Sequence, residues 1–124
     1  MRFIPTRIHG VLDYALGLLL ILSPRLFGFQ TGGIEAKLPV ILGVSALVYS
    51  LLTRYELGLV KVLPFRVHMT LDFLSGLLLA ISPWVFGFAD TVWVPHVLFG
   101  LLEIGVVMMT VPAPDHVHTV PAAR

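Results

Sequence analysis

Four long apolar segments constrain the fold of this chain more than any other feature of its sequence. They lie at about residues 8–27, 34–53, 67–88 and 94–111. Each is close to the roughly 20 residues that an α-helix needs to cross a bilayer. Every backbone amide in hydrocarbon needs a partner within the protein, and the segments show no strand-like alternation. We therefore predict an all-α chain with four membrane-spanning helices.

The composition agrees with a bilayer environment and argues against several functions. Of the 124 residues, 57% are hydrophobic and 12% are charged, which is more apolar surface than a small soluble domain can bury. The net charge of +1 gives no basis for nucleic-acid binding. Without cysteine, any metal site must use histidine or carboxylate ligands. No phosphate-binding loop, nucleophile elbow or metalloprotease helix is present, so we expect a lipid-embedded protein rather than an enzyme.

An internal repeat divides the chain into two halves. The residues from Ile4 to Tyr14 realign with those from Leu63 to Phe73, at an offset of 59. The coinciding positions are Pro5 and Pro64, Arg7 and Arg66, His9 and His68, Asp13 and Asp72, and Gly17 and Gly76. The second helix of each half aligns more weakly, through Gly43 and Gly100 at an offset of 57. The sequence therefore predicts two hairpin repeats, at 1–62 and 63–111.

Each predicted hairpin begins and ends on the same side of the membrane, so the two copies have parallel topology about an axis along the membrane normal. Together they form a four-helix bundle. The Pro-rich segment that follows, at 112–124, is expected to be extended when it is alone.

Basic residues gather at one end of this predicted bundle. Six of the 8 Lys and Arg residues fall on the side of the termini, and the other two, Arg25 and Lys37, lie near a hairpin tip. The six are Arg2, Arg7, Arg54, Lys61, Arg66 and Arg124. Cytoplasmic ends of membrane proteins carry such an excess of positive charge. We therefore predict that both termini are cytoplasmic.

A Ser-Pro pair recurs near the end of the first helix in each half, as Ser23-Pro24-Arg25 and Ser82-Pro83-Trp84. Proline removes a backbone donor, so we expect a helix break at each pair. The second copy resembles the SPW repeat of small bacterial and archaeal membrane proteins, whereas the first has Arg25 in place of tryptophan. The resemblance implies a repeat protein in the prokaryotic cytoplasmic membrane, and it implies no reaction.

Ionisable residues recur at helical spacing inside the predicted spans. His9, Asp13 and Gly17 are four residues apart, as are their counterparts in the second half, so each set forms one helix face. Glycine permits close helix approach, so we expect the two faces to meet. Because a buried ionisable group costs about 2.5–3.5 kcal/mol, these groups need partners. The expected polar network comprises Arg7, His9, Asp13, Arg66, His68, Asp72 and Glu103.

Three interpretations of this network remain open at the level of sequence. In the interpretation we favour, the arginines and histidines neutralise the carboxylates and fix helix packing, and no cofactor is bound. The protein is then an accessory or scaffolding subunit of a homo-oligomer or a larger membrane assembly. In the second, His9 and His68 are axial ligands of a b-type haem, with Arg7 and Arg66 at its propionates. In the third, the histidines with Asp13 and Asp72 bind a divalent metal or relay protons or ions.

Overall fold

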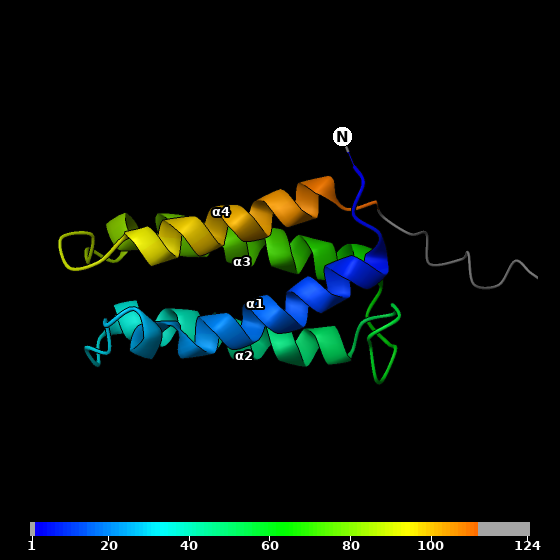
Figure 1. The fold of residues 1–124 in the computed structure, drawn as a ribbon, viewed down its shortest axis with the longest axis horizontal. Coiled ribbons are helices and arrows are strands. Elements are labelled where there is room, and N and C mark those ends of the chain that lie inside the picture. Colours follow the sequence, from blue (N-terminus) through cyan, green and yellow to red (C-terminus); the bar gives the residue numbers. More distant parts are fainter. Residues whose placement is uncertain (1, 112–124) are drawn as a thin grey trace, which may run out of the picture.

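The computed structural model describes residues 2–111, and their regular structure consists of four helices. The helices are α1 (Thr6–Leu26), α2 (Ile34–Leu51), α3 (Phe65–Val85) and α4 (Val94–Met109). α1 packs on α2 and α3 packs on α4, and the two hairpins lie side by side (Figure 1). The prediction of an all-α four-helix bundle is confirmed. The segment 112–124, predicted to be extended, lies outside the described residues.

The outside of the bundle is apolar and much of its inside is polar. α1, α2 and α3, with 21, 18 and 21 residues, are long and apolar enough to cross a membrane. α4 is apolar but shorter, with 16 residues. Leu18, Leu74 and Leu101 are 53%, 54% and 57% exposed, whereas histidine, aspartate and serine side chains are among the most buried. Such an outward apolar surface suits lipid and is rare on a soluble monomer.

The predicted breaks at the Ser-Pro pairs are wrong, because α1 and α3 continue through Pro24 and Pro83 into their last turns. Pro83 lacks the N–H that would bind the carbonyl of Leu79, four residues earlier. The hydroxyl of Ser82 donates to that carbonyl instead, at 2.7 Å. Ser23 makes the equivalent bond in the first repeat, at 2.8 Å. The serine thus replaces the missing donor and keeps the helix intact.

The helix ends after each Ser-Pro pair through a glycine with positive φ. Gly28 has φ 73° and Gly87 has φ 75°, in the left-handed region that favours glycine. The next residue in the second repeat, Phe88, donates its N–H to the carbonyl of Pro83 at 2.8 Å. This bond is the outer bond of a Schellman motif. The hairpin tip therefore starts at the same point in both repeats.

Small residues bring the two helices of each hairpin together. A Cβ atom on Gly100 would lie 2.5 Å from the carbonyl oxygen of Gly76, and one on Gly43 would lie 2.6 Å from that of Gly17. The glycines of α1 and α3 therefore contact α2 and α4. The expectation that Gly17 and Gly76 face each other is wrong, although the close approach of backbones that it assumed does occur.

Two equivalent junctions join the repeats at the end opposite the hairpin tips. Ile4, before α1, pairs with Thr110, after α4, and Thr53, after α2, pairs with Leu63, before α3. The N–H of Ile4 donates to the Met109 carbonyl at 2.9 Å. These junctions place the starts of α1 and α3 side by side.

Candidate functional site

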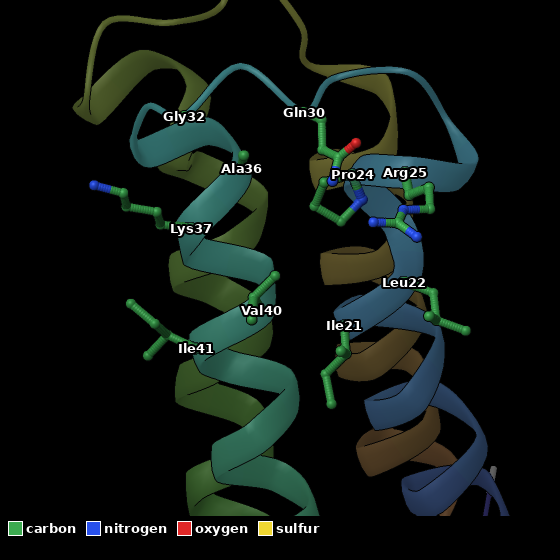
Figure 2. A pocket seen from close by; sticks show the side chains of 10 residues that line it. All are labelled: Ile21, Leu22, Pro24, Arg25, Gln30, Gly32, Ala36, Lys37, Val40 and Ile41. Atoms are coloured by element: carbon green, nitrogen blue, oxygen red, sulfur yellow. The ribbon is translucent and has the colours of Figure 1, made fainter.

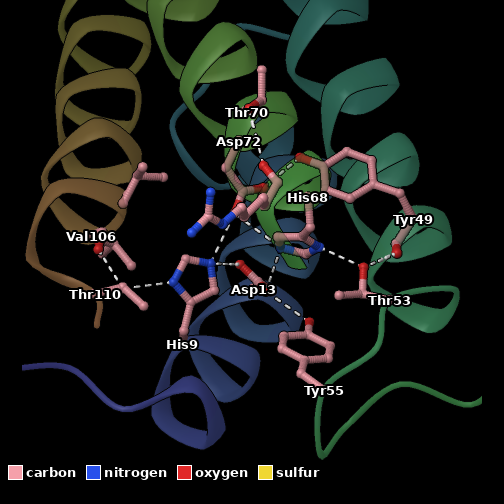
Figure 3. Close-up of polar contacts among 12 residues, drawn as sticks. His9, Asp13, Tyr49, Thr53, Tyr55, His68, Thr70, Asp72, Val106 and Thr110 are labelled. Atoms are coloured by element: carbon pink, nitrogen blue, oxygen red, sulfur yellow. Dashed lines mark hydrogen bonds and ion pairs between the residues drawn. The ribbon is translucent and has the colours of Figure 1, made fainter. Parts of the chain in front are cut away.

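Four side chains from the two repeats meet just inside these junctions. They are His9 and Asp13 of α1 and His68 and Asp72 of α3 (Figure 3). All four are buried, and one nitrogen or oxygen atom from each lies within 4.8 Å of the others. The spacing of four residues places histidine and aspartate on one face of each helix. We call these residues the His–Asp cluster.

Within the cluster each imidazole contacts both carboxylates. Nε2 of His9 lies 2.9 Å from Oδ2 of Asp72 and 3.1 Å from Oδ1 of Asp13. Nε2 of His68 lies 2.8 Å from Oδ2 of Asp13 and 3.0 Å from Oδ2 of Asp72. Despite these distances, Nε2 of His68 is aligned with no hydrogen-bond partner among residues 2–111. Both repeats are needed to assemble this arrangement.

Two threonines from the helix ends fix a proton on Nδ1 of each imidazole. Thr110 donates its hydroxyl proton to the Val106 carbonyl at 2.6 Å, and its oxygen lies 2.7 Å from Nδ1 of His9. A hydroxyl has a single proton, so Nδ1 must donate to Thr110. Thr53 holds His68 in the same way, at 2.7 Å. Each Nε2 is thereby left beside the carboxylates, at nitrogen–oxygen distances of 2.8–3.1 Å.

Two tyrosines orient the aspartates. Tyr49 of α2 donates to Oδ1 of Asp72 at 2.5 Å, and Tyr55, in the segment that joins the repeats, donates to Oδ2 of Asp13 at 2.7 Å. Burial and the neighbouring Asp13 carboxylate raise the pKa of Tyr55. Its phenol therefore remains a donor at neutral pH. These bonds hold both carboxylates toward the imidazoles.

Aromatic rings separate the cluster from the surroundings at the end of the bundle. The ring of Phe65, which is 1% exposed, is stacked on His68 with centroids 5.9 Å apart. The Phe65 and His9 rings are arranged edge to face, with centroids 5.4 Å apart. The ring of Tyr55 is likewise buried, and its centroid lies 5.2 Å from that of the His68 ring. The cluster therefore lies in a region of low polarity, where uncompensated charge is costly.

The two arginines proposed from the sequence lie outside the cluster. Arg7 and Arg66 are exposed. All four ion pairs among residues 2–111 join a histidine to an aspartate. Residues two apart on a helix point in different directions, so an arginine two positions before the histidine cannot share its face. The positive charge nearest the aspartates must come from the histidines or from a bound cation.

Glu103 is buried beside the cluster but is not one of its four members. It lies on α4 against Gly76, where an added Cβ would come 3.2 Å from the Glu103 Cβ. Its Oε1 has no hydrogen-bond partner within the described part of the chain. The aligned residue in the first repeat is Ala46, so this carboxyl is not duplicated.

The donor set fits a small cation better than a haem. Two imidazoles and two carboxylates are ligands for divalent first-row metals. Bonds of about 2.0–2.1 Å in a tetrahedral site separate neighbouring ligand atoms by about 3.3 Å, only slightly more than the nitrogen–oxygen contacts here. A haem plane between the two Nε2 atoms would occupy the place of the carboxylates, which lie within 3.1 Å of both. The cluster therefore does not fit a haem.

Sequence reasoning found the histidines and aspartates and missed the residues that orient them. Thr53 and Thr110 are related by the same offset of 57 as Gly43 and Gly100, so the repeat contained the signal for them. Tyr49 aligns with Val106, so no symmetry indicated it. Tyr55 lies in a connecting segment, whose path a helical pattern does not predict.

Comparison with known proteins links the chain to one family. The family model described as the SPW repeat domain matches residues 7–110. The match covers the His–Asp cluster and both Ser-Pro pairs, and it confirms the resemblance seen in the sequence. No curated protein and no solved structure matches the chain.

Proposed function

We propose that this chain, which belongs to the SPW repeat family, is a membrane protein that holds one divalent first-row transition-metal ion between its two repeats. The ligands are Nε2 of His9 and His68 and one oxygen each of Asp13 and Asp72. The observation that carries the proposal is the tautomer that the threonines impose. With Nδ1 as the donor to threonine, Nε2 of a neutral imidazole carries the lone pair, and it lies within 3.1 Å of both carboxylates.

Charge balance and the surrounding hydrogen bonds support the same proposal. Two ionised aspartates and two neutral histidines carry a charge of −2, which a divalent cation neutralises in a buried site. Metal-binding histidines generally donate their other N–H to an oxygen, which fixes the ring and its tautomer. The threonine partners serve that purpose here, and the tyrosines do so for the carboxylates.

A structural function is the second candidate, and the short contacts favour it. With both imidazoles protonated, the nitrogen–oxygen distances of 2.8–3.1 Å make a neutral set of ion pairs that needs no metal. The cluster would then only fix the packing of one hairpin against the other. In that case the chain acts as an accessory or scaffolding subunit of a membrane assembly.

Metal analysis of the purified protein separates the two candidates. The protein in detergent is incubated with Zn²⁺, Mn²⁺ or Fe²⁺, passed through a desalting column and analysed for bound metal. We expect one ion per chain, and its loss in His68→Gln and Asp72→Asn. His96→Gln is the matched control, because His96 is equally buried but lies between the hairpin tips, where its Nε2 donates to the Glu35 carbonyl at 2.8 Å.

Two results would decide for the structural function. One is a folded parent protein that retains none of the three metals. The other is undiminished metal in both cluster variants, which would place the ion elsewhere. Co²⁺ gives an independent readout, since tetrahedral binding by nitrogen and oxygen produces visible absorption bands that both variants should lose.

The orientation in the membrane is part of the proposal. Both hairpin tips lie at one end of the bundle, and the N-terminal segment and the connection between the repeats lie at the other (Figure 1). The excess of Lys and Arg at the second end supports a cytoplasmic location for it, in a prokaryotic cytoplasmic membrane. A reporter fused after Arg124 should be cytoplasmic, and one inserted at Gly32 should be outside. The opposite labelling would overturn this orientation.

A further inference from the structure

The two repeats differ where their helices approach the hairpin tips. In the first repeat a pocket of about 740 Å³ opens between α1 and α2 (Figure 2). Its walls are apolar and comprise Ile21, Leu22, Val40 and Ile41. Leu22 and Ile41 are 44% and 55% exposed on the lipid-facing surface. The pocket therefore opens sideways toward the bilayer as well as toward the tip.

The second repeat carries two tryptophans at the positions that align with residues of this pocket. Arg25 aligns with Trp84, and Ala36 aligns with Trp93. The rings of Trp84 and Trp93 lie against each other, with centroids 6.3 Å apart. A guanidinium and a methyl group thus replace two packed indole rings in the first repeat. This exchange removes aromatic bulk from the first repeat and adds a positive charge.

The polar residues of the pocket lie at its tip end, above the apolar walls. Figure 2 shows Arg25, Gln30 and Lys37 closer to the tip than Val40 and Ile41. No carboxylate lines the pocket within the described residues, so the charge of its lining is positive. The ammonium group of Lys37 extends away from α1 in this view, and its flexible stem permits it to turn toward the rim.

We propose that this pocket binds an anionic phospholipid of the leaflet at the hairpin-tip end. The phosphate is held by Arg25, with Gln30 and Lys37 beside it, and one acyl chain lies along the apolar walls. Guanidinium groups bind phosphate oxygens with two parallel hydrogen bonds. A lipid fits better than a soluble anion, because the charged rim and the apolar walls form one pocket that opens to the bilayer. This proposal does not depend on the metal site.

Native mass spectrometry of the protein in detergent tests the proposal. The probes are phosphatidylglycerol, which is anionic, and phosphatidylcholine with the same acyl chains, which is zwitterionic. We expect the parent protein to prefer phosphatidylglycerol, and Arg25→Gln to weaken its binding about fivefold, the usual effect of one basic residue at an anionic lipid surface. Arg54→Gln is the matched control, because Arg54 lies at the opposite end of the bundle.

A second variant separates a pocket from a merely charged surface. Arg25→Trp copies the second repeat, where tryptophan is accommodated at the aligned position, so the variant should fold. It removes the charge and places a bulky indole ring at the edge of the pocket, and it should weaken phosphatidylglycerol binding more than Arg25→Gln does. Equal binding of the two lipids by the parent would overturn the proposal. So would equal losses in Arg25→Gln and Arg25→Trp, or a loss in Arg54→Gln as large as that in Arg25→Gln.

Discussion

The hydrogen bond between Ser82 and the Leu79 carbonyl predicts a specific dependence of stability on the following proline. Both residues are 0% exposed, so Ser82→Ala leaves a buried carbonyl without its 2.7 Å donor. Loss of such a donor costs about 1–3 kcal/mol. Pro83→Ala restores an N–H that binds the same carbonyl within the helix. In that background Ser82→Ala should therefore cost only about 0.5 kcal/mol, the lower end for a hydrogen bond.

A double-mutant cycle measures this coupling directly. The parent, the two single variants and the double variant are unfolded in mixed micelles and followed by the circular dichroism of their helices. The predicted coupling energy is about 0.5–2.5 kcal/mol, from the difference between the two serine losses. Ser23 and Pro24 provide an internal control and should give a similar value. Equal losses from Ser82→Ala in both backgrounds would refute the proposed role of the serine.

Three further predictions concern the cluster and the helix contacts. Asp72→Leu leaves two imidazoles and the Tyr49 hydroxyl without their carboxylate partner and should lower the free energy of unfolding by about 3–5 kcal/mol. Asp72→Asn keeps the shape of the side chain and should lower it less. Equal stability of Asp72→Leu and the parent would show that the carboxylate compensates no buried charge. Gly100→Ala places a Cβ 2.5 Å from the Gly76 carbonyl oxygen and should lower the free energy of unfolding by about 1–3 kcal/mol in the same assay. Gly105→Ala is the control: its added Cβ would have no atom within 4 Å, so this variant should be neutral or slightly stabilising. Glu103→Gln should leave the amount of bound metal unchanged, because Glu103 is outside the four-residue cluster; loss of the metal would make it a ligand.

Much of the fold was contained in the sequence, because the bilayer leaves few alternatives. Apolar segments of sufficient length must be helical, and the repeated Pro-x-Arg-x-His motif defined two equivalent hairpins. The consequence of the Ser-Pro pairs was misjudged. A proline at 24 or 83 removes a donor, but the geometry that brings a serine hydroxyl to the carbonyl three residues earlier is visible only in three dimensions.

The membership of the site was only partly predictable. The four-residue spacing of His9 and Asp13 identified a shared face, and the repeat supplied the second pair. Arg7 was included because it is close in sequence, yet the rotation between residues two apart turns it outward. Contacts across the junctions between the repeats depend on the three-dimensional path of the connecting segments. For that reason the bond from Tyr55 to Asp13 had no counterpart in any sequence pattern.

The junctions between the repeats give the protein the architecture of a homodimer fused into one chain. His9 is held by Thr110 of the other half, and His68 is held by Thr53 of the other half. A single hairpin therefore lacks the threonine for its own histidine, whereas two identical hairpins around a twofold axis satisfy each other. Within one chain the two halves need not be identical. The first half carries Arg25 where the second carries tryptophan at the aligned position.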